Sequence, residues 1–217
     1  MDTSLIPRSV LFGDPDRARA RLSPDGKNLS FISPKNGVLN VWVAPALEPG
    51  KARALTSETE RSIVFYLWAY DNRHIVFGKD KGGDENWQLV AVDVESGAQR
   101  ALTPEQGVRA QVLHTSPGRP SEFLVGLNDR DPKWHDVYRV DVATGKRELV
   151  RKNEDGFAGF IADDGFRLRL GIKQRPDGSD AYFDPAAVGK KKDEPLFVVP
   201  HEDAVTTTPI GLDPQGR

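Results

Sequence analysis

Short apolar segments alternate with polar turns along the whole chain. The pattern is clearest at 166–173, FRLRLGIK, where apolar residues occupy every second position. A period of two predicts a β-strand with one buried face. Turn sequences such as Ser23-Pro24-Asp25-Gly26 separate the segments and supply the backbone angles of tight turns. We therefore predict an all-β protein built from many hairpins.

A repeated tetrapeptide sets the period of this pattern. Arg53-Ala54-Leu55-Thr56 recurs unchanged at Arg100-Ala101-Leu102-Thr103, and a weaker copy is Arg147-Glu148-Leu149-Val150, so the copies begin 47 residues apart. Polar turns beginning at 23, 70, 116, 162 and 213 keep nearly the same step. The last step is longer because it contains the charged stretch 190–194, which we interpret as a loop insertion. Repetition on this scale indicates a repeat architecture.

Each repeat contains about four expected strands. Four strands in about 47 residues, repeated in tandem, is the spacing of β-propeller blades. A β-sandwich also has short strands, but it does not require a pattern that returns every fourth strand. We expect blades at about 19–57, 62–104, 108–151 and 157–201. The expected strands are 19–22, 28–33, 38–44, 52–56, 63–69, 74–79, 87–94, 99–103, 109–115, 122–127, 136–142, 146–150, 158–162, 166–173, 181–184 and 196–200.

The segment 205–217 predicts the first strand of a fifth blade, followed by a turn at 213–216. A part-blade leaves an unpaired edge, so we expect this partial β-propeller to be a piece of something larger. Three explanations stay open for an end at Arg217: truncation, which we favour, cleavage with the remainder still bound, or self-association through exposed blade edges.

Composition narrows the class of partner. The net charge of −2 argues against a general nucleic-acid or anionic-membrane binder, and no apolar run reaches membrane-helix length. The absence of cysteine excludes disulfides, a thiol nucleophile and Cys-ligated metal sites. The first ten residues lack a basic leader followed by an apolar stretch, which favours a cytoplasmic protein; a periplasmic one stays open if a signal peptide was removed.

Several stretches resemble one peptidase family. Leu5-Ile6-Pro7-Arg8 with Val10-Leu11-Phe12-Gly13, then 21–26 and 39–43, are similar to the propeller start of prolyl-oligopeptidase-family serine peptidases. The nearest subgroup is the bacterial dipeptidyl-aminopeptidase and acylaminoacyl-peptidase type. The segment 82–89, GGDENWQL, strengthens the match. The similarity covers the whole chain, although only these stretches are specific.

The resemblance implies a two-part enzyme. A propeller would sit over a C-terminal α/β-hydrolase domain with a Ser–Asp–His triad and would limit the serine to peptide substrates. We expect the hydrolase domain to be absent from this chain, so that the chain is a substrate-gating part, inactive alone, of a peptidase that cleaves short units from peptide N-termini. Neither dipeptidyl nor acylaminoacyl specificity is indicated. The alternative is a non-enzymatic, TolB-like propeller that binds a protein partner.

The chain itself offers little catalytic chemistry. No G-x-S-x-G nucleophile elbow occurs, and Ser179 follows Asp177-Gly178 as a turn serine. Without an activated serine, we assign no catalytic role to the four histidines, which are His74, His114, His135 and His201.

Metal and cofactor signals are equally weak. Asp129-Arg130-Asp131 lacks the Gly and distal Glu of a calcium loop, and His201-Glu202-Asp203 is interpreted as a solvated cluster. The glycine-rich phosphate-binding motifs G-x-x-x-x-G-K-[ST] and G-x-G-x-x-G are both absent from the sequence. We expect no metal and no cofactor.

The expected strands also place the tryptophans and the hairpin loops. We predict that Trp42, Trp68 and Trp87 fill the space between blades, and that Trp134 is exposed at a loop rim. Connections between second and third strands should share one propeller face, which could meet substrate or a hydrolase domain. These loops are 33–38, 80–86, 128–135 and 174–180, and no single residue in them is assigned to substrate.

Overall fold

The computed structural model describes residues 5–13, 15–104, 107–188, 194–209 and 211–213. It contains four antiparallel sheets of four strands, each formed by consecutive strands. The sheets are β1–β4 (Ala18–Leu22, Asn28–Lys35, Val38–Pro45, Arg53–Ala54), β5–β8 (Tyr66–Trp68, His74–Lys79, Gln88–Asp93, Gln99–Ala101), β9–β12 (Ala110–Ser116, Arg119–Asp131, Trp134–Asp141, Arg147–Arg151) and β13–β16 (Gly159–Ala162, Leu168–Gln174, Asp180–Phe183, Phe197–Val199). The only described helices are α1 (Arg8–Phe12) and a 3-10 turn at Pro49–Lys51.

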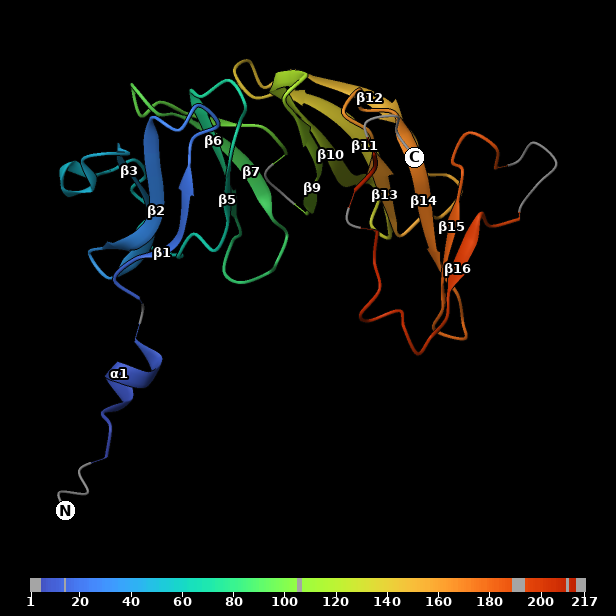
Figure 1. The fold of residues 1–217 in the computed structure, drawn as a ribbon, viewed down its shortest axis with the longest axis horizontal. Helices are drawn as coiled ribbons and strands as arrows, with labels where there is room; N and C mark the ends of the chain where they lie inside the picture. The colour runs from blue at the N-terminus through green and yellow to red at the C-terminus, as the bar shows by residue number, and fades with distance from the viewer. Residues whose placement is uncertain (1–4, 14, 105–106, 189–193, 210, 214–217) are drawn as a thin grey trace.

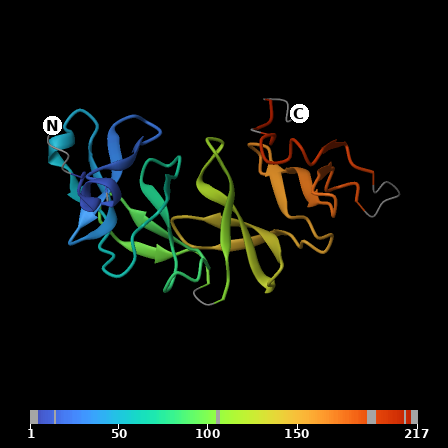
Figure 2. The same cartoon turned by 90° about the horizontal axis from the view of Figure 1, so that it is seen from below.

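The four sheets stand side by side along an arc, as Figure 1 shows, with β1, β9 and β13 on its inner side and β12 and β16 on its outer side. The view from below in Figure 2 shows the same succession of sheets from the N-terminal to the C-terminal end. The radial arrangement of four-stranded antiparallel sheets confirms the predicted propeller fragment. No helix in the described ranges is long and apolar enough to cross a membrane.

Apolar side chains fill the space between each pair of neighbouring sheets. Three clusters are present, and each takes residues from two consecutive sheets. The largest fully buried members include Tyr66 and Phe77 between the first two sheets, Phe123 between the second and third, and Phe157 between the third and fourth. Burial of both faces of the middle sheets is therefore the main stabilising contribution to the stack of blades.

The repeated Arg-Ala-Leu-Thr motif has the same role in the first two sheets. Leu55 and Leu102 are buried in the inter-sheet clusters. The following threonines are also buried: Thr56 Oγ1 accepts a hydrogen bond from the Val41 N–H, and Thr103 Oγ1 accepts one from the Leu89 N–H, both at 2.9 Å. The motif thus fixes the outer strand against the third strand after the regular ladder has ended.

The weaker third copy does not repeat these contacts. Leu149 and Val150 are both 44% exposed on β12, and valine has no hydroxyl to accept a backbone hydrogen bond. In this sheet a carboxylate binds the end of the blade: Asp136 Oδ1 accepts a hydrogen bond from the Asn153 N–H at 2.7 Å. A different side chain therefore closes the third blade.

Residues one period apart touch across blades. The Tyr66 hydroxyl donates to the Arg19 carbonyl at 2.6 Å, and the Asp25 N–H donates to Asn72 Oδ1 at 2.8 Å; the partners are 47 positions apart in each pair. Equivalent turns thus lie beside each other. A step of one repeat along the sequence therefore leads to the equivalent position in the next blade.

Glycines on two second strands allow aromatic rings to pass close over the sheet. A Cβ added at Gly78 would lie 2.1 Å from the Phe65 ring, and one added at Gly171 would lie 2.5 Å from the Phe157 ring. Real Cβ atoms do not approach so closely, so these positions require glycine for space rather than for backbone angle.

Two expectations about strands failed by the widest margin. β10 spans Arg119–Asp131, well beyond the expected 122–127, because it continues past an irregularity to pair Asp131 with Trp134 of β11. The expected first strand of a fifth blade is not formed in the described residues of 205–212, where Val205 and Thr206 lie in a turn. These residues have no neighbouring strand to pair with, and a strand needs a ladder partner for its backbone groups. Residues 190–193 and 214–217 lie outside the described residues.

Replacing Thr103 by valine is expected to lower the free energy of unfolding by about 1–2 kcal/mol, because the buried Leu89 N–H loses its acceptor while side-chain volume hardly changes. Urea denaturation would measure the loss. The matched control is Thr144→Val, whose hydroxyl bonds to Asp141 at the exposed surface and should change stability by less than about 0.5 kcal/mol. Equal effects of the two substitutions would contradict the role given to the motif.

Candidate functional site

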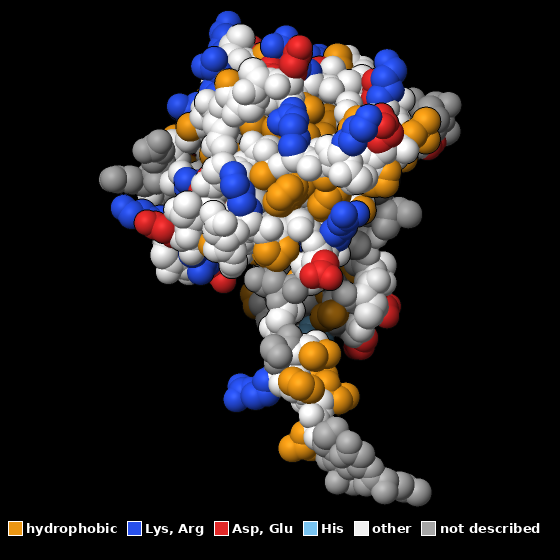
Figure 3. Space-filling view, turned by 90° about the vertical axis from the view of Figure 1, so that its left-hand side faces the viewer, with side chains coloured by type: hydrophobic (Ala, Val, Ile, Leu, Met, Phe, Trp, Pro, Cys, Tyr) orange, Lys and Arg blue, Asp and Glu red, His pale blue; other side chains and the backbone are white. Residues whose placement is uncertain are grey.

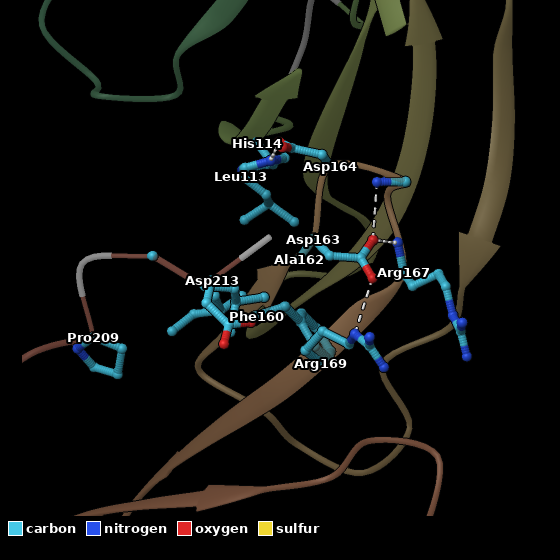
Figure 4. Close-up of a pocket in the computed structure, with 14 residues that line it drawn as sticks. Leu113, His114, Phe160, Ala162, Asp163, Asp164, Arg167, Arg169, Pro209 and Asp213 are labelled. Carbon is cyan, nitrogen blue, oxygen red and sulfur yellow. Dashed lines mark hydrogen bonds and ion pairs between the residues drawn. The ribbon is translucent and has the colours of Figure 1, made fainter. Parts of the chain in front are cut away.

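A pocket of about 480 Å³ lies where the inner strands of the third and fourth sheets meet, and Figure 4 shows its lining. Leu113 of β9 and Phe160 and Ala162 of β13 supply apolar walls. The segment 209–213 lines the pocket through its described residues. We call this the blade 3–4 pocket. It lies between two first strands, β9 and β13.

Ion pairs line the polar side of the blade 3–4 pocket. Asp163 Oδ1 accepts the N–H groups of Gly165 and Arg167, both at 3.0 Å, and Asp163 Oδ2 lies 2.9 Å from Arg169 Nε (Figure 4). Burial of Asp163 opposes ionisation, but these N–H donors and Arg169 outweigh it and hold the pKa of the carboxyl below its usual range. The carboxylate is therefore charged and already partnered, which suits a structural role rather than proton transfer.

The rim of this pocket contains one histidine. His114 Nε2 lies 3.3 Å from Asp164 Oδ1, and its ring meets Phe166 edge to face with centroids 6.0 Å apart. None of the described residues that line the pocket is serine or threonine. The pocket could therefore hold a small ligand between apolar and charged walls, but it presents no hydroxyl nucleophile.

A second pocket of about 510 Å³ lies between the connection 58–61 and the hairpin that joins β6 to β7. We call it the hairpin pocket. The Arg61 guanidinium pairs with both oxygens of Asp80 at 3.2 and 3.0 Å, and the Asp80 side chain is 2% exposed. Lys79 Nζ lies 2.8 Å from Glu58 Oε2. These pairs fix the loop 80–86, one of the four predicted from the sequence, against the neighbouring connection.

The third sheet has a similar anchor at the same end. Arg130 donates to both carboxylate oxygens of Asp136 at 2.7 Å and also to the Asn153 carbonyl at 3.3 Å. The Arg130 hydrogen bond holds the pKa of the Asp136 carboxyl below its ordinary value, although burial opposes the shift. Beside it, burial lowers the pKa of the His135 imidazole, and its Nε2 is buried without a hydrogen-bond partner. A neutral His135 is consistent with that site.

The histidines and serine singled out from the sequence do not form a catalytic arrangement. His74 Nδ1 lies 2.6 Å from Asp71 Oδ2, and His201 lies in a turn after β16 beside Gly178. Ser179 Oγ donates to Asp177 Oδ1 at 2.7 Å within its own turn. Within the described ranges, no three His, Asp or Glu side chains converge in a way that could hold a metal ion.

The positions of the three tryptophans predicted between blades agree only partly with the prediction. Trp68 does lie between blades, since it is 8% exposed and its Nε1 donates to Ser30 Oγ of the first sheet at 2.8 Å. Trp87 contacts Phe65 edge to face within the second blade. Trp42 lies outside the cluster between the first two sheets, because its strand neighbours Val41 and Val43 occupy the inward positions.

Trp134 was wrongly expected at an exposed rim. It is half-buried in β11, and its ring packs 3.2 Å from the position that a Cβ on Gly156 would take. The expected strand began too late, at 136, so the side chain was placed in the loop.

Apart from the loop 80–86, sequence reasoning missed most of the residues that line the two pockets. Arg61 and Asp80 have no motif, because their pairing joins a connection to a hairpin 19 residues away. The blade 3–4 pocket did carry a signal: His114 and Ile161 are one period apart and both line it. Residues separated by the repeat length on first strands are neighbours across blades, so the period could have located this pocket.

No family model matches the chain. The chain is 45% identical over 217 residues to dipeptidyl aminopeptidase BIII of Pseudoxanthomonas mexicana, a match that covers 99% of this chain and 31% of the relative. It spans about a third of the length of the curated relatives that it matches.

Solved structures share the fold at low identity. The acylaminoacyl peptidase of Pyrococcus horikoshii aligns with a TM-score of 0.53 and 19% identity over 79% of this chain and 31% of that protein. TolB of Acinetobacter baumannii aligns with a TM-score of 0.52 and 16% identity over 79% of this chain and 41% of that protein. Likeness at this identity concerns architecture alone. The 45% identity over nearly the whole chain and the repeated four-stranded blades therefore make this chain a β-propeller segment that is similar to prolyl-oligopeptidase-family peptidases.

Proposed function

We propose that this chain is the substrate-gating propeller portion of a serine peptidase that removes short units from peptide N-termini. The observation that carries the proposal is the 45% identity to a dipeptidyl aminopeptidase over 99% of the chain. At that level the relationship concerns more than architecture, whereas the TolB likeness supports the fold only. The partners would be a hydrolase domain of the longer protein and its peptide substrates.

The proposal assigns no catalytic group to the 217 residues. Their sequence has no G-x-S-x-G elbow, and the blade 3–4 pocket has no hydroxyl among its described lining residues. The anchored hairpin ends of the second and third sheets offer a firm surface on which a second domain could rest, because Arg61–Asp80 and Arg130–Asp136 hold their loops. The propeller would then control which substrates reach the hydrolase domain and would take no part in the cleavage itself.

The isolated 217-residue chain is expected not to hydrolyse dipeptidyl or acyl-peptide chromogenic substrates, because it lacks a nucleophile elbow. Release of the chromophore and labelling by a serine-directed fluorophosphonate would be measured together. Turnover that survives purification and is blocked by the fluorophosphonate would contradict inactivity.

Gating is tested on a longer protein that includes the hydrolase domain. It should cleave a short peptide and leave a folded protein with the same N-terminal residues intact; equal rates would contradict restricted access. A reading frame that continues without G-x-S-x-G and a later histidine would favour the TolB-like binding role instead.

A further inference from the structure

Three exposed arginines lie within five residues at the inner strand of the first blade: Arg19 and Arg21 on β1, and Arg17 directly before it. We call them the β1 arginines. In the described part of the chain none of them forms an ion pair with Asp or Glu. Elsewhere the opposite is common: Arg61, Arg73, Arg130, Arg139, Arg151 and Arg169 are each paired with a carboxylate. The β1 arginines are thus a local excess of positive charge without its counter-charge.

Aromatic rings hold two of these guanidinium groups. The Arg17 guanidinium carbon lies 4.9 Å from the Phe31 ring centroid, and that of Arg21 lies 5.9 Å from the Tyr66 ring centroid. Phe31 and Tyr66 are 3% and 1% exposed, so both rings are fixed platforms. A guanidinium stacked on a ring keeps its N–H edge free for a planar acceptor and loses less freedom when it binds one.

A backbone irregularity lies among the β1 arginines. Ala18 pairs with Ile32 and Arg21 with Ser30, so one extra residue is accommodated, and Arg19 has a φ of 52°. β1 ends its sheet, with a neighbouring strand on one side only. Such a bulged, charged edge resists the addition of another strand. A partner would therefore be recognised by the arginine side chains rather than by backbone pairing.

Positive charge is also concentrated in the N-terminal part of the sequence. Residues 1–57 contain eight Lys or Arg and five Asp or Glu, whereas the remainder contains 22 and 27. Figure 3, which looks at the end of the molecule formed by the first sheet, shows Lys and Arg side chains surrounding an apolar surface. A short ligand with negative charges and some apolar content fits this end better than a long polyanion, which would meet the acidic remainder.

We propose that the β1 arginines form a binding surface for acidic peptides, in which two or more peptide carboxylates pair with the guanidinium groups on the inner side of the first blade. The surface is independent of the hydrolytic role proposed above, because it needs neither a hydrolase domain nor cleavage. Arg–carboxylate pairing is favoured by the matching fork geometry of the two groups.

Binding of a fluorescein-labelled hexaglutamate peptide to the 217-residue chain, followed by fluorescence anisotropy at low ionic strength, tests the proposal. Affinity should fall as salt is added, because exposed ion pairs are screened. Arg17→Gln, Arg19→Gln and Arg21→Gln together should weaken binding by at least about fivefold, as expected for the loss of several exposed pairs. The triple Arg→Lys variant should weaken it less, since charge remains while stacking and the fork are lost.

The matched control removes the same charge from exposed positions on or directly before outer strands, with Arg100→Gln, Lys146→Gln and Arg147→Gln combined. This variant should bind hexaglutamate like the unmodified chain. Equal weakening in both triple variants, or no binding by the unmodified chain, would overturn the proposal. Tighter binding of a labelled hexathymidylate than of hexaglutamate at equal salt would also overturn it, because the surface would then favour phosphates. Circular dichroism melting of each variant excludes unfolding as the cause.

Discussion

Replacing Phe157 by alanine is expected to destabilise the fold by about 3–5 kcal/mol, the range for removing a large buried aromatic side chain. Phe157 is 1% exposed, meets Phe160 edge to face at 5.3 Å, and lies in the cluster between the third and fourth sheets. Its neighbours are held by strands on both sides, so they cannot collapse into the cavity. Chemical denaturation followed by circular dichroism would measure the change.

The control for this prediction is Phe12→Ala, because Phe12 is 78% exposed and its loss should change stability by less than about 0.5 kcal/mol. Gly171→Ala provides a second arm: alone it should cost about 1–3 kcal/mol through overlap with the Phe157 ring, and in the Phe157→Ala background most of that cost should disappear. Additive effects would show that the close approach of ring and strand is not what requires glycine.

Replacing Asp136 by alanine is expected to cost about 2–4 kcal/mol. The substitution leaves Arg130 without its carboxylate and the buried Asn153 N–H without an acceptor. The estimate lies below that for a fully buried pair because the Arg130 side chain is 36% exposed. Urea denaturation at neutral pH would measure the loss. The control is Glu148→Ala, which breaks the exposed pair with Arg139 and should cost less than about 1 kcal/mol.

The same pair predicts a pH dependence. The folded-state pKa of Asp136 is lowered, so the stabilisation it provides is complete above the ordinary aspartate pKa of about 4 and is lost as the pH falls further. The difference in stability between the unmodified chain and Asp136→Asn should therefore shrink on acidification below about pH 4. A difference that stays constant down to pH 2 would contradict the role of the charged carboxylate.

Much of the local structure could be predicted because the signals are local. The expected strand 74–79 coincides with β6 (His74–Lys79), and the two full Arg-Ala-Leu-Thr copies make equivalent contacts through Thr56 and Thr103. Strand ends were less accurate where hairpins extend beyond the apolar run, as at β10. Hydrogen bonding between strands continues there through polar residues, which an apolar pattern does not mark.

The candidate site was less predictable than the blades. The loop 80–86 was chosen by its place between second and third strands, and it does line the hairpin pocket, but the pairing of Arg61 with Asp80 has no spacing rule. Trp42 was predicted to lie between blades and yet lies outside the core cluster that its strand neighbours Val41 and Val43 join. Side-chain partners across blades depend on register and on the packing of two sheets at once.

The sequence by itself determined the repeat, the four strands in each repeat and the order in which the sheets follow one another. These features depend on period-two patterning and turn residues, which act over a few positions in the chain. Only the tertiary structure decided which charged residues are neutralised, as at Arg130 and Asp136, and which stay free, as at the β1 arginines. The reason is that ion pairing depends on distances of a few ångströms between segments that the chain brings together only when whole blades pack.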